Sequence, residues 1–321
     1  SVSGGSIATA HLALRWDALM ARPGDVDVFV DEFQQPLFDF AGKRIDAVAG
    51  GLGMLTPGRS IATSVAASYR RHLFGDATLA DLPDDPRFVF CATNLGSGAL
   101  VRFSKPYTAD YRIGKRDGLT LPLADVVAAS AAFPPVLSPM VIELGPDQAL
   151  TEQFAGSPDE EPPELAGRDS YATRLELSDG GVYDNLGMQP IERFQTMLVS
   201  DGGGPFQYEP KVPVNWLQHM IRAWKVTDNQ VRALRRSGFV DELETGTRHG
   251  AFWGIQTRYS DYENRSVAVD DAWADELKAI STRLWHLDRD QRKQLVNWGY
   301  AVCDAAVRTY VSGDIEPATL P

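Results

Sequence analysis

Two strand-like runs separated by a helix-like segment place the strongest constraint on the fold. The runs are T-R-L-E-L-S (173–178) and T-M-L-V-S (196–200), and their β-branched and apolar residues favour strands. Between them lie the loop D-G-G-V-Y-D-N-L-G (179–187) and the helix-like segment M-Q-P-I-E-R-F (188–194). A strand–helix–strand unit places its two strands parallel in one sheet. The pattern therefore predicts an α/β fold whose sheet is at least partly parallel.

Helix-like and strand-like patterns alternate through the rest of the chain. Apolar residues at helical spacing predict a first helix over 7–20 and another over 123–133. R-F-V-F-C-A-T-N (87–94) predicts a strand. From about residue 214 onward three helical stretches dominate, with one strand near 251–259. The simplest interpretation is a single domain over all 321 residues with a helical C-terminal portion.

A segment from about 145 to 173 differs in composition from its surroundings. It is rich in proline, glycine and acidic residues and includes D-E-E-P-P-E (159–164). Such a stretch cannot bury enough apolar surface to order itself. We expect an exposed insertion, which could act as a mobile cover over a site or simply be a solvated loop.

Charge and composition exclude several classes of protein. The net charge of −12 and the pI near 4.9 argue against nucleic-acid binding and against electrostatic attachment to anionic lipid. Any peripheral membrane contact must therefore be local and apolar. No apolar run is long enough to span a bilayer, and no signal peptide is recognisable. Cys91 and Cys303 lack the spacing of a metal or redox site, so no metal or cofactor is expected.

The first candidate site is S-V-S-G-G-S at residues 1–6. A serine nucleophile needs an exposed hydroxyl on a tight turn, small neighbours, and a helix N-terminus that favours developing negative charge. Ser3 satisfies this pattern, with Gly4 and Gly5 beside it and the predicted helix behind it. Ser1 stands where the pattern G-x-S-x-G has its first glycine. The competing interpretation is a flexible end or an ordinary helix cap.

The second candidate site is S-D-G-G-V-Y-D-N-L-G, in which Asp179 follows a predicted strand. In open α/β sheets, catalytic groups collect where strands end, and an aspartate held near a serine can act as its general base. Turn chemistry alone would also explain D-G-G. The same signature recurs in S-D-G-G-G at Asp201, so spacing does not choose between the two aspartates.

A third segment makes the combination specific. D-V-V-A-A-S-A-A-F-P-P-V-L-S-P (125–139) is a small-residue helix that runs into a proline-fixed turn. Together and in order, V-S-G-G-S, A-A-S-A-A-F-P-P and D-G-G-V-Y-D-N-L-G resemble the nucleophile elbow, the central helix and turn, and the catalytic aspartate loop of bacterial patatin-like phospholipases. L-V-N-W-G-Y-A-V-C-D-A-A (295–306) also resembles that family, so the likeness spans nearly the whole chain.

The resemblance implies a fold and a role for each matching residue. The fold would be a three-layer α/β/α, patatin-like sheet of modified α/β-hydrolase type, mostly parallel. Ser3 would be the acylated nucleophile, Asp179 its general base, and the N–H of Gly4 an oxyanion donor. Asp201 would lie beside the site without acting as base. No histidine would take part, and the five histidines, at 11, 72, 219, 249 and 286, show no triad motif.

The resemblance also implies elements upstream of Ser3. Patatin-like enzymes have a strand and a Gly-rich oxyanion loop with an arginine before the nucleophile. Because the sequence given starts at the turn, we expect that N-terminal strand and loop to be missing, as in an N-terminally truncated chain. V-A-G-G-L-G-M (48–54) lacks the arginine and lies downstream, so it is no replacement. Loss of one oxyanion donor costs about a hundred- to a thousandfold in rate, which predicts low activity.

Further expectations concern the substrate. Phe133 and Pro134, with Pro135, could border an acyl pocket, although core packing explains them equally well. R-A-L-R-R (232–236) could meet phosphate head groups, although a solvated basic face is the simpler interpretation.

The predicted function is lipid acyl hydrolysis of phospholipase A, lysophospholipase or esterase type. Its partner would be a lipid or other acyl ester, with no cofactor. Three alternatives remain open: acyl transfer to an acceptor other than water, a non-catalytic binding or storage protein, and a processed N-terminal nucleophile at Ser1. Cellular location and oligomeric state leave no signal in the sequence.

Overall fold

The computed structural model describes residues 1–43, 45, 60–151, 164–165, 167–212, 214–280, 286–316 and 319–320. The glycine-rich segment 48–54 and most of the acidic run 159–164 lie outside these residues. By their contacts the residues form two compact units, which are described separately. Unit 1 comprises Ser1–Pro190 with Leu284–His286, and unit 2 comprises Ile191–Arg283 with Leu287–Pro321. The expectation of one domain stays a prediction, because contacts alone do not decide whether the units fold separately.

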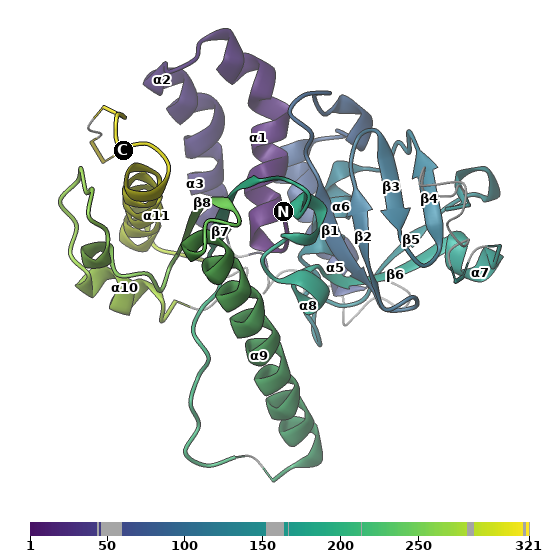
Figure 1. Ribbon diagram of the computed structural model, residues 1–321. Coiled ribbons are helices and arrows are strands. Elements are labelled where there is room, and N and C mark those ends of the chain that lie inside the picture. The colour runs from purple at the N-terminus through teal and green to yellow at the C-terminus, as the bar shows by residue number, and fades with distance from the viewer. Residues whose placement is uncertain are drawn as a thin grey trace. The chain divides into compact units, whose positions relative to one another are not determined.

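A six-stranded sheet forms the centre of unit 1, and Figure 1 shows its strands side by side. The strand order is β4-β3-β2-β1-β6-β5, and every neighbouring pair is antiparallel. The strands are β1 (Phe90–Asn94), β2 (Ala99–Phe103), β3 (Tyr107–Asp110), β4 (Gly114–Asp117), β5 (Met140–Glu143) and β6 (Arg174–Asp179). The chain is thus a mixed α/β protein, as predicted.

The prediction of a mostly parallel sheet is wrong. β6 pairs with β1 and β5, whereas β7 (Thr196–Asp201) leaves this sheet and pairs in parallel with β8 (His249–Gly254). The crossover helix expected between β6 and β7 does not form. The segment holds only the short α8 (Gly181–Asp184) and a 3₁₀ turn over Gln189–Ile191.

Helix α6 (Leu123–Ser130) lies in the middle of unit 1. It packs against β1 and β6 on one side and against α1 (Gly4–Ala21) and α5 (Ile61–Tyr69) on the other. All of its residues except Asp125 are buried. Its alanines and Ser130 have small side chains that allow backbones to approach closely, so α6 connects the start of α1 to the end of β6.

Further α-helices among the described residues of unit 1 are α2 (Val26–Phe29), α3 (Gln35–Ala41) and α7 (Asp169–Ala172). Phe40 of α3 and Ala172 of α7 belong to its core. At the two ends of the predicted acidic insertion, Leu150 and Ala172 are buried in the core.

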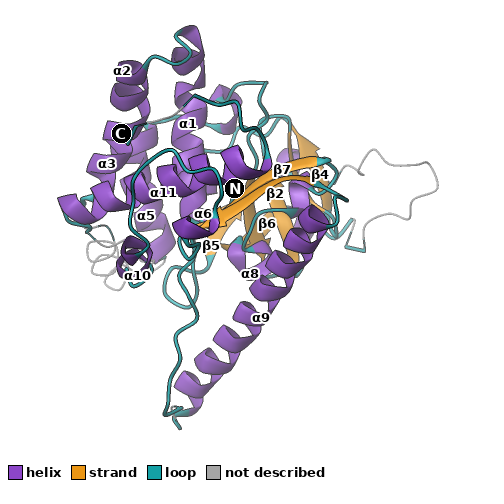
Figure 2. Cartoon of the chain, turned by 60° about the vertical axis from the view of Figure 1, so that its left-hand side comes forward, coloured by secondary structure: helices purple, strands orange, loops and turns teal. Residues whose placement is uncertain are grey.

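The described residues of unit 2 contain β7 and β8 together with three α-helices, and Figure 2 shows α9 as one uninterrupted element. The helices are α9 (Trp216–Glu244), α10 (Ala272–Leu277) and α11 (Arg289–Tyr310). The core of unit 2 forms where the small and aromatic residues of α11, such as Trp298 and Ala305, pack with Ala251 of β8. None of the described helices has a stretch long and apolar enough to cross a bilayer.

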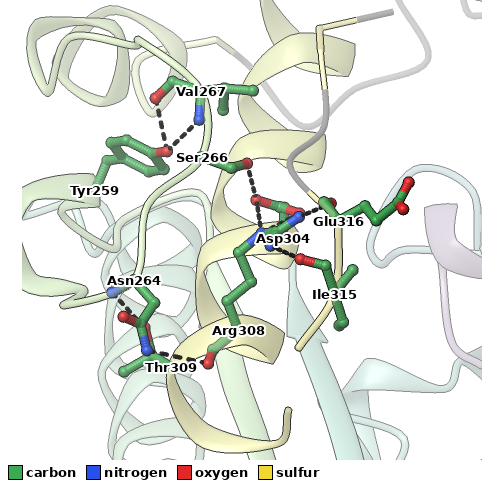
Figure 3. A network of polar contacts seen from close by, with 9 residues as sticks. All are labelled: Tyr259, Asn264, Ser266, Val267, Asp304, Arg308, Thr309, Ile315 and Glu316. Carbon is green, nitrogen blue, oxygen red and sulfur yellow. Dashed lines mark hydrogen bonds and ion pairs between the residues drawn. The ribbon is translucent and has the colours of Figure 1, made fainter. Parts of the chain in front are cut away.

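A buried ion pair fixes the loop before α10 and the C-terminal segment onto α11 (Figure 3). The guanidinium Nε of Arg308 donates to both carboxylate oxygens of Asp304 at 2.9 Å, and Ser266 donates to the same carboxylate. The terminal nitrogens of Arg308 donate to the carbonyls of Ile315 and Glu316. Each charge in this low-dielectric setting has a partner, which is the condition under which buried charges are tolerated.

Candidate active site

Ser3 has a strained backbone at the entrance to α1. Its φ of 53° and ψ of −134° make it the one non-glycine residue with positive φ among the described residues. Such conformations cost about 1–3 kcal/mol and persist only where the surroundings impose them. Ser3 is the N-cap of α1, yet its side chain makes no capping hydrogen bond. The N-caps Ser60 and Asn215, by contrast, accept bonds from their helices.

The residues before Ser3 run parallel to the start of β1. The amino nitrogen of Ser1 donates to the carbonyl of Val89 at 2.7 Å, and the amide of Cys91 donates to the carbonyl of Ser1 at 3.0 Å. These are the two bonds of a parallel bridge. The chain then turns at Ser3 into α1. This extended segment, sharp turn and helix together form the local geometry that exposes a nucleophilic hydroxyl.

A chain of buried hydroxyls lies beneath the turn. Ser1 Oγ is 3.1 Å from Ser6 Oγ, which is 2.8 Å from Ser130 Oγ, and Ser130 Oγ donates to the carbonyl of Cys91 at 2.7 Å. Ser6 and Ser130 are completely buried. The chain ties the first turn of α1 to the end of α6 and to β1, so it holds the strained conformation of Ser3 in place.

One carbonyl oxygen links the two predicted catalytic segments. The oxygen of Ser130 accepts from the amide of Ser3 at 3.1 Å and from the amide of Gly180 at 3.1 Å. Gly180 follows Asp179 directly. The end of α6 thus brings the Ser3 turn and the Asp179 turn to the same point, although 176 positions separate the two residues in the sequence (179 − 3).

Asp179 is the last residue of β6, and it is buried. Its amide donates to the carbonyl of Ala132 at 2.9 Å, and its own carbonyl accepts from the hydroxyl of Thr93 at 2.8 Å. Its carboxylate Oδ1 accepts from the amide of Gly181 at 2.7 Å. Backbone and side chain are both held, so the carboxylate has a defined orientation at the strand end.

The first glycine of the D-G-G turn is required by close packing. A Cβ on Gly180 would lie 2.3 Å from the carbonyl oxygen of Cys91 and 2.9 Å from a methyl group of Val2. No side chain larger than hydrogen fits there. Gly180 therefore allows the Asp179 turn to contact both β1 and the segment that leads into Ser3.

Asp201 has the same local turn with a different partner. Its Oδ1 accepts from the amide of Gly203 at 2.9 Å, as the Oδ1 of Asp179 does from Gly181. The carboxylate of Asp201, however, forms a bidentate ion pair with Arg232, with N···O distances of 2.7 Å. It belongs to unit 2. Both carboxylate oxygens of Asp201 are therefore bound by a guanidinium, whereas the carboxylate of Asp179 accepts from a backbone amide.

The glycines after Ser3 face open space. A Cβ built on Gly4 or Gly5 would meet no atom within 4 Å, so packing does not explain these two glycines. The first N–H groups of a helix have no intrahelical acceptor, and in α1 they belong to these glycines. They carry the positive end of the helix dipole. The arrangement suits an approaching acyl group whose oxygen becomes negative.

Phe133 and Pro134 follow α6 next to the aspartate turn. Half of the Phe133 side chain is exposed, and Pro134 is half-buried. Their neighbour Ala132 is the residue whose carbonyl binds the Asp179 amide. Phe133 therefore lies at the surface, and the acyl-pocket border stays a prediction.

Burial raises the pKa of both cysteine thiols, Cys91 and Cys303. The Cys91 thiol is buried, so it is unreactive near neutral pH. No cluster of metal-ligating side chains occurs in the described ranges. His11 and His286 bind backbone carbonyls, those of Glu32 and Gly42.

Ser6, Ser130 and Thr93 are site residues that sequence inspection missed. Ser130 and Thr93 bind backbone groups of the site, and Ser6 binds the hydroxyl of Ser130. The one available signal was the polar Ser130 within the apolar run V-V-A-A-S-A-A-F. A buried hydroxyl in such a run needs a partner, and here its partners are Ser6 and the carbonyl of Cys91.

Fold and site together define a class: mixed α/β proteins in which a strained serine opens a helix beside the strand-end turn of a buried aspartate. The family model for patatin-like phospholipases matches residues 1–191, more than half of the 321 residues. The chain therefore belongs to the patatin-like phospholipase family, whose general activity is the hydrolysis of lipid acyl groups. A search of curated proteins found no match. The matched range contains every residue of the candidate site.

Proposed function

We propose that the protein is a lipid acyl hydrolase that acts through an acyl-enzyme on Ser3, with Asp179 as the general base. The observation that carries this proposal is the shared Ser130 carbonyl, which accepts from the Ser3 amide and from the amide that follows Asp179. It explains why a strained serine, with a hydroxyl not used for capping, lies at the same point of the fold as a buried aspartate.

The first half-reaction transfers the acyl group to the enzyme. Asp179 takes the hydroxyl proton while Ser3 Oγ forms a bond to the ester carbonyl carbon, and the carbonyl electrons move onto its oxygen. The N–H of Gly4 and the dipole of α1 stabilise this oxyanion. When the oxyanion collapses, the bond to the leaving alkoxide breaks, and the alkoxide takes the proton back from Asp179.

The second half-reaction releases the fatty acid. Water attacks the acyl carbon while Asp179 removes its proton, and the new tetrahedral species expels Ser3 Oγ, which is reprotonated. The same carboxylate serves both halves because the atoms that need a base are at the same position. The exposed ring of Phe133 gives an acyl chain an apolar surface beside the aspartate turn.

Active-site labelling tests the nucleophile. The protein is treated with a fluorophosphonate, and the modified residue is located by mass spectrometry of the N-terminal peptide. We expect the adduct on Ser3, with loss of both labelling and p-nitrophenyl ester hydrolysis in Ser3→Ala. Ser1→Ala is the matched control, because Ser1 lies two residues away and contacts Ser6; we expect it to be labelled normally.

Two outcomes would overturn the proposal. An adduct on Ser1 would indicate an N-terminal nucleophile, and full activity in Ser3→Ala would place the reaction elsewhere or reveal a contaminant. Product analysis with competing alcohol acceptors separates hydrolysis from acyl transfer. A dominant ester product in water would assign the protein to the transferases.

A further inference from the structure

Helix α9 turns an apolar stripe toward solvent. Of the 29 residues in this fully described helix, only Phe239 is buried. Weakly polar and apolar residues recur at every third or fourth position, and residues at that spacing share one helix face. All of them are exposed: Trp216, Met220, Ala223, Thr227, Val231 and Leu234. We call these six residues the α9 stripe.

The opposite face of α9 is held by polar contacts within unit 2. Arg232 forms its bidentate ion pair with Asp201 and donates to the carbonyls of Gly203 and Gly204 at 2.6 and 2.7 Å. Arg222 donates to the carbonyl of Gln207 at 2.7 Å and to the carboxylate of Glu209 at 3.2 Å. The usual arrangement is therefore reversed, with charged side chains packed inward and the apolar stripe outward.

Exposed apolar side chains concentrate where α9 begins. They lie in the segment before the helix and in its first turns: Tyr208, Val212, Val214, Trp216, Leu217 and Met220. We call these six residues the apolar tip. Val214 is 100% exposed, Tyr208 90% and Trp216 75%. Isolated exposed hydrophobics are ordinary, whereas six exposed apolar side chains within thirteen positions (208–220) suggest a binding surface.

The local charge of this surface is opposite to that of the chain. Between residues 207 and 227 the charged side chains are Lys211, Arg222, Lys225 and Glu209, a net charge of +2 (3 − 1), in a chain of net charge −12. Because Glu209 is paired with Arg222, the positive charge comes from the exposed Lys211 and Lys225. Lysines beside exposed apolar side chains favour a partner whose outer layer is negatively charged and whose interior is apolar.

We propose that the apolar tip and the α9 stripe bind the surface of an anionic lipid membrane. Tryptophan and tyrosine favour the boundary between head groups and acyl chains, and amphipathic helices lie in that plane with lysines toward anionic lipid. The contact is peripheral. It goes beyond the chemistry at Ser3 and does not depend on it.

The charges disfavour a second copy of the chain as the occupant. In a two-fold dimer each patch meets an identical patch. Lys211 and Lys225 would then face the same lysines of the other copy, and two chains of net charge −12 would be brought together. Like charges across an interface oppose association.

Vesicle co-sedimentation tests the proposal with the full chain carrying Ser3→Ala, so that binding is measured without hydrolysis. The vesicles are phosphatidylcholine with or without phosphatidylglycerol. We expect binding that requires phosphatidylglycerol and falls about tenfold in Val214→Glu, because one apolar side chain leaves the lipid and one anion is added. Val26→Glu is the matched control, an exposed valine in α2, and should bind normally.

A second variant tests how much the two lysines contribute to membrane binding. Lys211→Glu with Lys225→Glu should abolish binding to the phosphatidylglycerol-containing vesicles, while gel filtration shows one unchanged molecular size. Equal binding by Val214→Glu and Val26→Glu would overturn the proposal. So would a dimer that Val214→Glu dissociates without any vesicle binding. Hydrolysis of a soluble p-nitrophenyl ester by Val214→Glu with Ser3 intact reports the Ser3 chemistry separately, and it should be unchanged.

Discussion

Ser3 and Gly180 are connected through a single atom, the carbonyl oxygen of Ser130, to which both amides donate at 3.1 Å. A carbonyl oxygen has two lone pairs, and here each serves one half of the proposed catalytic pair. The position of the serine turn relative to the aspartate turn is therefore set by backbone atoms of a third segment, α6. Side-chain substitutions at Ser3 or Asp179 leave this connection intact, so their effects report chemistry more than misplacement.

Replacing Ser3 by glycine or by alanine separates strain from catalysis. Both variants lose the hydroxyl, so both should lose ester hydrolysis. Glycine tolerates the φ of 53°, whereas alanine does not, so Ser3→Gly should be more stable than Ser3→Ala by about 1 kcal/mol. Urea unfolding measures the difference. Equal stability, or a more stable alanine variant, would show that the turn is not strained.

The two D-G-G turns give a matched test of the base. Asp179→Asn should lower hydrolysis by about a hundred- to ten-thousandfold, since a general base contributes that much. Asp201→Asn should keep most of the activity but lose on the order of 2 kcal/mol of stability, because Arg232 loses a charged partner. Hydrolysis rates and thermal unfolding of both variants are compared. Loss of activity in Asp201→Asn alone would reverse the assignment.

The same pair of turns tests the packing at Gly180. In Gly180→Ala the new methyl group meets the carbonyl oxygen of Cys91 at 2.3 Å, which should cost about 3 kcal/mol through overpacking. Gly202 has the equivalent place after Asp201, and a Cβ there meets nothing within 4 Å. Gly202→Ala should therefore change stability by less than about 0.5 kcal/mol. Similar unfolding midpoints for the two variants would contradict this packing.

His11 makes unit 1 sensitive to mild acid. Its Nε2 lies 3.1 Å from the carbonyl of Glu32, so Nε2 carries the proton. Nδ1 is buried without a partner in the described part of the chain. Burial, with Arg15 nearby, lowers the pKa of His11 below the ordinary 6.5. As the pH falls, His11 is therefore protonated at a higher pH in the unfolded chain than in the folded protein.

The sign of the pH dependence follows from linkage. Above pH 6.5 His11 is neutral in both the folded and the unfolded state, so its protonation does not lower the free energy of unfolding. Below this pH the free energy of unfolding should fall by up to about 1.4 kcal/mol per pH unit, until the folded histidine also titrates. Urea unfolding from about pH 7 to about pH 5 should show a shallower slope in His11→Gln. An identical slope in both proteins would show that His11 does not titrate in this range.

Local features of the fold were predictable from the sequence. Helical spacing after Gly4 and β-rich residues before Asp179 placed α1 and β6 correctly, because these patterns reflect neighbouring residues. The antiparallel direction of neighbouring strands in the sheet was not predictable from such local patterns. β6 pairs with β1, more than 80 positions earlier (174 − 90 = 84), and such pairing leaves no periodic trace in either strand.

The residues of the candidate site also fall into two groups: those that a local sequence motif indicates and those that only long-range contacts reveal. Ser3, Gly4 and Asp179 belong to short motifs whose residue types indicate chemistry, so the sequence could nominate them. Ser130 acts through its carbonyl oxygen, which every residue has, and through a hydroxyl bond to Ser6 across 124 positions. Backbone atoms that organise a site have no sequence signature. Likewise, only the structure shows that Arg232 pairs with Asp201.

The inward-facing charges of α9 have a thermodynamic consequence. A helix that buries Phe239 alone among its residues makes polar contacts with the rest of unit 2 through Arg222, Arg232 and Glu242, the last paired with Arg248. Heat capacity changes on unfolding arise mainly from exposed apolar surface, so detachment of this helix would change the heat capacity little. Amide hydrogen exchange would detect it, since local opening is measured residue by residue. The longest described helix can thus loosen with little change in heat capacity while the alanine-rich core of unit 2 remains folded.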